Sequence, residues 1–139
     1  MPDDDCLFCK IVAGELPAEI VQEDEHTIAF MDINPWTRGH ALVIPRNHSR
    51  NLYDAPDDDL AHTVTAAKRL ALRMRDRLGC DGINLLNSCE PAAWQTVFHL
   101  HVHVIPRKAG VAMKPPATEK ERPEVLADHA LKLAAALKG

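Results

Sequence analysis

Apolar stretches separated by turn-forming residues predict that short strands make up much of this chain. Three segments rich in β-branched and apolar residues lie in the first third of the sequence, as in antiparallel strands joined in succession. Two more such segments follow in the second half, and Pro106 is expected to end the last of them. The five predicted strands are residues 19–23, 27–31, 41–44, 82–87 and 97–105.

A long helix is predicted between the third and fourth strands. Over residues 56–78, apolar side chains recur every three or four positions, which is the period of one helix face. Aspartates in the first turn suit the positive end of the helix dipole, and Gly79 follows the last turn. Shorter periodic segments predict a helix over residues 6–14 and another over residues 123–137.

These elements together predict an α+β fold. We expect a mostly antiparallel five-stranded sheet with a long helix, a short N-terminal helix and a C-terminal helix. The length of 139 residues fits one domain with one core. Residues 1–109 are expected to form the body of that domain, and residues 110–139 to add a Pro- and Lys-rich connector and the last helix.

Composition and charge narrow the classes of function. Hydrophobic residues make up 46% of the chain and charged residues 26%, and no apolar run approaches the ~18 residues of a membrane span. The net charge is -4 and the lysines and arginines are scattered, which argues against a nucleic-acid partner. The acidic N-terminus lacks the features of a secretory signal, so we expect a cytoplasmic protein with no membrane partner.

Three histidines, His99, His101 and His103, alternate with apolar residues in the last predicted strand. Because successive side chains of a strand point to opposite faces, the three rings would project from one face about 7 Å apart. Three imidazoles packed side by side would each need a polar partner, so simple packing does not explain the pattern. We interpret the row of histidines as functional.

Two kinds of chemistry use such a row. Imidazole is a good metal ligand, and it also works as an acid, base or nucleophile near neutral pH. The neighbouring Gln95, Thr96 and Asn87 carry neutral hydrogen-bonding groups that suit phosphate oxygens, and no extra carboxylates complete a catalytic metal site. The neighbours therefore favour chemistry at a phosphate, and His40 could join from a third strand.

The run QTVFHLHVHVI at residues 95–105 resembles the signature of the histidine triad family of nucleotide hydrolases and transferases. The upstream segments FMDINP at 30–35 and GHALVIP at 39–45, followed by His48, are similar to earlier parts of the family's pattern. The segment CLFCKIV at 6–12 adds to the resemblance, which extends over most of the chain. The combination resembles the zinc-containing bacterial type of the family.

The resemblance implies a role for each matched residue. His101 would attack the α-phosphorus of a nucleoside phosphate derivative, giving a nucleotidyl-histidine intermediate that water resolves. His103 and His40 would bind or polarise phosphate oxygens, and Asp32 would accept the ribose hydroxyls. The phosphate cradle would be completed by Gln95, Thr96 and Asn87. The apolar wall around the base would consist of Phe8, Ile11, Leu16, Phe30 and Ile33.

A structural zinc ion is also implied by the resemblance. A C-x-x-C pair alone is compatible with zinc, redox chemistry or chance. Many bacterial relatives pair such cysteines with a histidine after the third strand and with the first histidine of the triad. The corresponding ligands here are Cys6, Cys9, His48 and His99. A set of two cysteines and two histidines is closed and tetrahedral, which suits structural rather than catalytic zinc.

The implied activity is cleavage of a nucleoside phosphoramidate, with a purine nucleotide such as AMP or GMP as product and a homodimer as the assembly. A dinucleoside polyphosphate hydrolase is the alternative within the same chemistry. Two alternatives belong to another class of function: a nucleotide-binding regulatory module with little turnover, and a zinc-stabilised interaction protein. Trp94 stands where many family members carry glycine, in a loop on the leaving-group side, so this difference bears on the choice of leaving group.

Overall fold

The computed structural model describes residues 5–113 and 120–138, and it confirms the predicted α+β class. Residues 114–119 of the predicted connector lie outside the described part. The elements in chain order are α1 (Leu7–Val12), β1 (Ile20–Glu23), β2 (Thr27–Met31), β3 (Ala41–Pro45), α2 (Asp57–Leu78), β4 (Gly82–Leu86), the 3₁₀ helix η1 (Pro91–Ala93), β5 (Val102–Arg107) and α3 (Pro123–Lys138).

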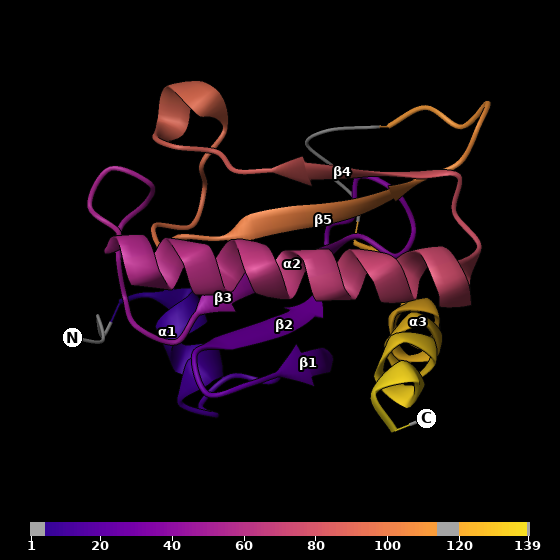
Figure 1. Cartoon of the computed structure of the whole chain (residues 1–139), viewed down its shortest axis with the longest axis horizontal. Coiled ribbons are helices and arrows are strands. Elements are labelled where there is room, and N and C mark those ends of the chain that lie inside the picture. Colours follow the sequence, from indigo (N-terminus) through magenta and orange to yellow (C-terminus); the bar gives the residue numbers. More distant parts are fainter. Residues whose placement is uncertain (1–4, 114–119, 139) are drawn as a thin grey trace.

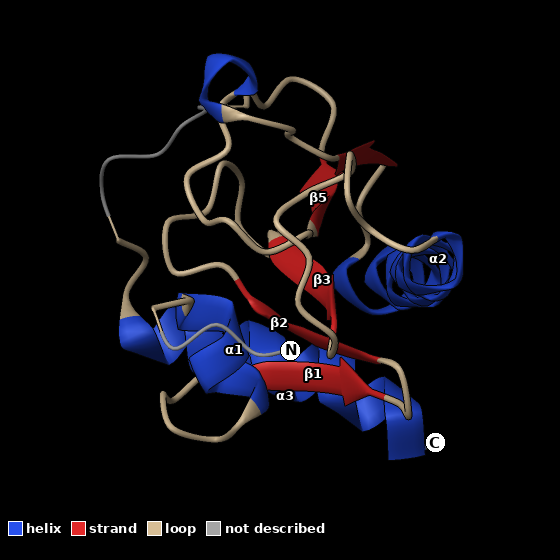
Figure 2. Cartoon of the chain, turned by 90° about the vertical axis from the view of Figure 1, so that its left-hand side faces the viewer, coloured by secondary structure: helices blue, strands red, loops and turns tan. Residues whose placement is uncertain are grey.

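The five strands form one antiparallel sheet in the order β1-β2-β3-β5-β4. Helix α2 runs along one face of this sheet, with α3 beside it and close to β1 (Figure 1). Helix α1 covers part of the opposite face (Figure 2). The sheet is therefore sandwiched between helices, and β4 forms one of its edges.

Helix α2 follows the predicted range within one residue at its N-terminus. Three aspartates occupy its first turn, and Gly79 ends it with a φ of 66° in the left-handed region, a conformation that glycine adopts without strain. Its inner face packs against the sheet through Ala66, Ala67, Leu70 and Met74, which are fully buried. Among residues 5–113 and 120–138, no helix is long and apolar enough to cross a membrane.

Strands β2 and β3 are buried along their whole length because helices cover both faces of the sheet. Ala29 and Val43 belong to the core beneath α2 and α3, whereas Phe30 and Leu42 belong to a second core beneath α1. The alternation along each strand thus distributes side chains to two cores. The second core includes the cysteine pair at the start of α1, because Cys6 and Cys9 both pack within it.

Strand register places the functional candidates on the α1 face of the sheet. Leu42 pairs with Phe30 on one side and with His103 on the other, and paired residues share a face. Side chains two residues apart in a strand lie on the same face. Asp32 lies two residues after Phe30, just beyond β2, and His40 lies two residues before Leu42, just ahead of β3. The ladder continues there, because Asp32 N–H donates to the His40 carbonyl at 3.0 Å.

The prediction of a strand over residues 97–105 is wrong at both ends. The chain bends at Val97–His99, and β5 begins only at Val102, so His99 does not belong to the strand. Its backbone is instead close to the loop after β3, because Leu100 N–H donates to the Ser49 carbonyl at 2.9 Å. The three histidines therefore do not form one straight row, and His99 is turned toward other partners.

Pro106 does not end the last strand, contrary to the prediction, because β5 continues through it to Arg107. Pro106 pairs with Ile83 of β4, and its carbonyl accepts a hydrogen bond from the Thr37 hydroxyl at 2.7 Å on the other side. The nitrogen and carbonyl of a strand residue point the same way. The missing N–H therefore faces the residues that precede β3, where the ladder with β3 has not begun and needs no donor.

Candidate functional site

The first turn of α1 brings two thiols together. Cys6 is the N-cap residue, with an extended backbone (φ -84°, ψ 118°), and its Sγ accepts the backbone N–H of Cys9 at 3.2 Å. This capping arrangement satisfies one of the free amides of the helix start and fixes both sulfurs on one side of the turn. Both cysteines are buried. The C-x-x-C segment thus caps the helix and also places two sulfur atoms where they can bind a metal ion.

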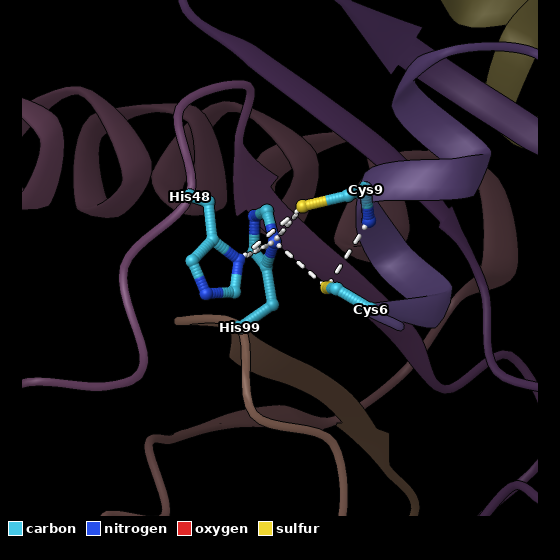
Figure 3. Close-up of side chains that lie close together, drawn as sticks. All are labelled: Cys6, Cys9, His48 and His99. Carbon is cyan, nitrogen blue, oxygen red and sulfur yellow. Dashed lines mark hydrogen bonds between the residues drawn. The ribbon is translucent and has the colours of Figure 1, made fainter. Parts of the chain in front are cut away.

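Two imidazoles face these sulfurs (Figure 3). His48 comes from the loop after β3, and His99 comes from the bend before β5. His99 Nε2 lies 2.8 Å from the carbonyl oxygen of Pro45, so the hydrogen-bond pattern assigns the ring proton to Nε2. The lone pair of His99 is then on Nδ1, which is the atom turned toward Cys6 and Cys9.

The spacing of the four donor atoms fits a tetrahedral ion. His99 Nδ1 is 3.4 Å from each sulfur, Cys9 Sγ is 3.2 Å from His48 Nδ1, and the two Nδ1 atoms are 3.3 Å apart. Bonds of ordinary zinc length would set sulfur and nitrogen about 3.5 Å apart and two nitrogens about 3.3 Å apart. All four atoms lie within 4.8 Å of one another. The residues present therefore fit a closed Cys₂His₂ zinc site.

A second cluster of histidines is linked by a directional hydrogen-bond chain. The Trp36 backbone N–H donates to His40 Nδ1 at 3.0 Å, which leaves the ring proton of neutral His40 on Nε2. His40 Nε2 lies 2.8 Å from His103 Nδ1, so His40 donates and His103 accepts. The remaining proton of His103 is then on its Nε2. The backbone of one turn thereby sets the tautomer of two histidines in sequence.

Burial keeps this histidine pair uncharged. The removal of water, with a smaller contribution from the nearby His101, lowers the pKa of His40 and that of His103 to about 3. His40 is completely buried and does not line the cavity described below, whereas His103 lies on the cavity wall. His103 can therefore touch a ligand, and His40 acts through His103.

His101 presents the opposite nitrogen to the cavity. Its Nδ1 lies 2.7 Å from the carbonyl oxygen of His99, which assigns the proton to Nδ1 and leaves the lone pair on Nε2. Burial lowers the pKa of His101, which keeps the ring neutral. The Phe8 ring packs nearly perpendicular to the His101 ring at 5.2 Å between centroids, and Asn87 Nδ2 donates to the His101 carbonyl at 2.9 Å. The ring is thus held in one orientation.

A cavity of about 610 Å³ opens beside His101 and His103. This volume falls in the range of small-molecule sites. Most of the wall is apolar, and the predicted base-wall residues all belong to it. The wall residues expected from the sequence are Phe8, Ile11, Leu16, Phe30 and Ile33. Others that the sequence did not single out are Leu7, Pro17, Ala18, Met31, Asn34, Trp36, Leu42 and Val97.

Asp32 is the carboxylate in the cavity wall. One of its oxygens accepts the backbone N–H of Asn34 at 2.8 Å, and the other lies 3.5 Å from His40 Nε2. Burial raises the pKa of Asp32, and the Asn34 hydrogen bond opposes that rise. The turn thus orients the carboxylate toward the cavity, where it can accept hydrogen bonds from a ligand.

The loop between β4 and β5 is anchored to the loop after β3 by buried polar groups. Gln95 donates to the carbonyls of Arg50 and Val97 at 2.8 and 3.1 Å, and its Oε1 accepts from the Glu90 backbone and from Asn51 at 2.8 and 3.1 Å. Its hydrogen-bonding capacity is therefore used within the protein. Arg50 adds a bidentate ion pair to Glu90, with both contacts at 2.9 Å.

This loop carries two residues in the left-handed region of backbone conformation, Glu90 with φ 75° and Trp94 with φ 77°. Such a conformation costs a non-glycine residue on the order of 1–3 kcal/mol. Trp94 is nevertheless 56% exposed, and the edge-to-face contact with Trp36 lies at 6.1 Å between ring centroids. Trp36 itself stacks on His103 at 5.0 Å.

Two residues predicted for the phosphate cradle lie outside the cavity wall. Gln95 anchors the loop, and Asn87 holds the His101 backbone, so both position other groups. Thr96 does line the cavity. Sequence reasoning missed Trp36 as a wall residue and the Arg50–Glu90 pair as a loop anchor. Trp36 follows a proline in a turn, and this position could have marked it as a candidate wall residue. Arg50 and Glu90 are forty residues apart, so no local pattern in the sequence indicates that they pair.

Comparisons with known proteins show the family to which this chain belongs. A sequence profile of the HIT domain matches residues 13–110. Adenosine 5'-monophosphoramidase HNT1 of Saccharomyces cerevisiae is 40% identical over 119 residues, covering 84% of this chain and 73% of the yeast protein. The chain therefore belongs to the HIT, or histidine triad, family.

Two solved structures are similar over nearly the whole chain. A HIT-like protein of Bartonella henselae superposes with a TM-score of 0.91 at 40% identity, over 96% of this chain and 97% of that one. A zinc-bound histidine triad family protein of Mycobacterium smegmatis superposes with a TM-score of 0.85 at 38% identity, over 96% and 94% of the two chains. The fold is thus that of the HIT family.

Proposed function

We propose that this HIT-family protein is a nucleotide hydrolase that cleaves nucleoside phosphoramidates at the α-phosphorus. The orientation of His101 carries the proposal, because the His99 carbonyl 2.7 Å from Nδ1 leaves the lone pair on Nε2. An imidazole fixed in this tautomer beside a cavity is prepared for nucleophilic attack. The similarity to a yeast protein named as an adenosine 5'-monophosphoramidase supports the choice of substrate.

The nucleoside end of the substrate binds against the apolar wall near α1. Phe8, Ile11 and Leu16 offer a surface for a purine base, and Phe8 also contacts His101. The ribose hydroxyls donate to Asp32, which is a stronger acceptor than a neutral group when ionised. A purine nucleotide placed in this way brings its α-phosphate to His101, so AMP or GMP derivatives are the proposed substrates.

In the first chemical step, the lone pair of His101 Nε2 forms a bond to phosphorus. The bond from phosphorus to the amine nitrogen breaks, and its electron pair leaves with the amine, which takes a proton from solvent. His103 Nε2–H and Thr96 stabilise the charge on the phosphate oxygens as it shifts during the displacement. The product of this step is a nucleotidyl-histidine.

In the second step, water attacks the same phosphorus atom. The bond from phosphorus to His101 Nε2 breaks, its electron pair returns to the nitrogen, and the water releases one proton to solvent. The net reaction consumes one water and releases a nucleoside monophosphate and an amine. Dividing one displacement into two lowers the barrier that either step must cross.

We further propose that Cys6, Cys9, His48 and His99 hold one structural zinc ion, whose contribution when bound is a cross-link between α1 and the sheet. The spacing of the donors supports this, as does the zinc-bound relative of Mycobacterium smegmatis. His99 would thereby fix the peptide whose carbonyl orients His101. The ligands thus support the nucleophile without contacting the substrate.

The proposed assembly is a homodimer in the cytoplasm. Strand β4 is an edge of the sheet, and its Leu85 is 47% exposed, which suits pairing with a second copy. Sedimentation or light scattering measures the mass in solution, and a monomer at micromolar concentration would contradict the proposed dimer.

A substrate panel tests the activity and separates the alternatives. Adenosine and guanosine phosphoramidates, dinucleoside polyphosphates and nucleotidyl sugars are offered to the wild type, and monophosphate release is scored. Release from the phosphoramidates supports the proposal, whereas faster release from dinucleoside polyphosphates favours the alternative hydrolase. Binding of AMP without release from any compound favours a regulatory module. His101→Ala should abolish release, and His26→Ala, a surface histidine stacked on His62, is the matched control.

A further inference from the structure

A continuous series of aromatic contacts runs through the cavity wall. Phe8 contacts His101 at 5.2 Å, His101 contacts His103 at 5.0 Å, and His103 stacks on Trp36 at 5.0 Å, all between ring centroids. Trp94 extends the series, 6.1 Å from Trp36. The nucleophile therefore has an aromatic surface on each side of it in this series. If the nucleoside base occupies the Phe8 side, the pair of tryptophans remains beyond His103.

Trp94 is poorly explained by packing. Its indole is 56% exposed, and its backbone φ of 77° is one that favours glycine. A large apolar side chain gains little stability at such a position, yet the loop that carries it is firmly anchored through Gln95 and the Glu90–Arg50 pair. The ring is thus presented at the cavity from a fixed backbone. A strained and exposed aromatic residue on a fixed loop beside a cavity is typical of a binding surface.

The charged residues of the cavity wall indicate which kinds of leaving group can bind there. Among the described residues that line the cavity there is no lysine and no arginine, and Asp32 is acidic. A leaving group with further phosphates would find no cation there to offset its charge. An uncharged flat ring, in contrast, can stack on or pack edgewise against indole. The wall therefore favours an aromatic amine over a nucleoside polyphosphate as the departing group.

We propose that Trp36 and Trp94 form a subsite for the leaving group, selecting amines that carry a flat aromatic ring. The proposal rests on the proposed phosphoramidase function and adds a specificity for the departing side of the same substrate. Trp36 forms the buried floor of the subsite against His103, and Trp94 forms its exposed wall. Contacts made there by the leaving group help to align the bond that breaks.

The test compares two substrates that differ in the flatness of one ring. The adenosine 5'-phosphoramidates of 2-phenylethylamine and 2-cyclohexylethylamine have the same linker and similar size, and the unsubstituted phosphoramidate reports the chemistry alone. The wild type should prefer the phenyl compound in kcat/KM by about threefold to tenfold, the range of an aromatic pair. Trp94→Gly should bring that ratio close to one, and Trp94→Phe should keep part of it.

Tyr53→Ala is the matched control, because Tyr53 is an aromatic residue that is 81% exposed and does not line the cavity. This variant should keep the wild-type ratio. A ratio near one in the wild type, or a ratio that Trp94→Gly leaves unchanged, overturns the subsite while the phosphoramidase function stands. Faster cleavage of diadenosine triphosphate than of the phenyl compound also overturns it. If the wild type cleaves no phosphoramidate at all, the proposed function itself fails and the subsite falls with it.

Discussion

His40 Nε2 lies 2.8 Å from His103 Nδ1, and this hydrogen bond, together with the one from the Trp36 amide, determines the protonated nitrogen of both rings. The Trp36 amide occupies His40 Nδ1, so His40 has its proton on Nε2 and donates it toward His103. His103 then turns a donor, rather than a lone pair, toward the cavity that it lines. In the proposed mechanism, the buried His40 is thus a positioning residue for the donor that binds the phosphate.

Replacing His40 should therefore slow the chemistry without removing any group that touches the substrate. In His40→Ala, His103 Nδ1 loses its donor, and the ring can carry its proton on the wrong nitrogen. We expect kcat for a phosphoramidate to fall about 10- to 100-fold, the usual effect of removing a supporting partner. His40→Gln keeps a side-chain donor and should recover part of the loss, measured by steady-state kinetics on both variants.

The same pair predicts a loss of stability in acid. The pKa of each ring is lowered to about 3 in the folded protein, whereas it is about 6.5 in an unfolded chain. Between these values the unfolded state binds protons that the folded state does not, so stability falls as the pH falls below 6.5. Each neutral ring contributes a slope of about 1.4 kcal/mol per pH unit within that window.

The variant His103→Gln removes one of the two rings. The slope of the unfolding free energy against pH should therefore be shallower by about 1.4 kcal/mol per pH unit. Urea unfolding of zinc-loaded protein between pH 5 and 6 measures the slope for both proteins. Asp32, whose raised pKa acts in the opposite direction, is present in both and does not obscure the comparison. Above pH 7 neither protein should show this dependence. If the free energy of unfolding depended on pH in the same way in both proteins, this result would contradict the burial of His103 as an uncharged group.

Much of the fold follows from local patterns in the sequence. The period of apolar residues located α2 almost to the residue, and β-branched segments located β2 at its observed bounds. These two elements depend on neighbours in the chain, which a single sequence displays directly. Phe8, Phe30 and Asp32 line the cavity, and they were expected there because the resemblance to the histidine triad family implied it.

Features that depend on tertiary contacts could not be read in the same way. The alternation of His99 with apolar residues mimics a strand, but its ring is drawn to Pro45 and to the thiols of α1, so the chain bends there. Gln95 looks like a phosphate ligand in the sequence, but its side-chain amide already forms hydrogen bonds with Arg50 and Asn51 of another loop. In both cases a long-range polar contact overrides the local pattern.

Zinc should co-purify at about one ion per chain when no chelator is used. Cys6→Ser with Cys9→Ser removes both sulfur ligands and should reduce bound zinc to background, because two imidazoles alone hold the ion weakly. The loss of the cross-link should lower the melting temperature by about 5–10 °C, as expected for about 2 kcal/mol. Elemental analysis and calorimetry measure the two effects.

The matched control for zinc changes the other two cysteines. Cys80→Ser with Cys89→Ser alters thiols that lie outside the donor cluster, so this variant should keep its zinc. Equal melting of the two double variants would show that α1 does not depend on a metal. Zinc retained by the Cys6 and Cys9 variant would show that the ion binds elsewhere.

Asp32→Ala should weaken the binding of AMP by about 10- to 100-fold. The loss of a charged acceptor for hydroxyl groups is worth about 1.5–3 kcal/mol. Isothermal titration with AMP measures the affinity, and 2',3'-dideoxy-AMP is the matched ligand that lacks the ribose donors. That ligand should bind the wild type and the variant alike. An equal effect of Asp32→Ala on both ligands would remove the carboxylate from the ribose site.

The covalent intermediate should be found on His101 and on no other histidine of the triad. His99 has its lone pair turned toward the thiols and His103 has its Nδ1 occupied by His40, whereas the lone pair of His101 Nε2 has no such partner among the contacts described. Rapid quenching of the wild type with adenosine phosphoramidate, followed by peptide mass spectrometry, should place an adenylyl group on His101. His101→Ala should form no adduct, because a reacting atom displaced by about 1 Å already costs about 100-fold in rate. An adduct on His99 or His103 would show that the assigned tautomers are wrong.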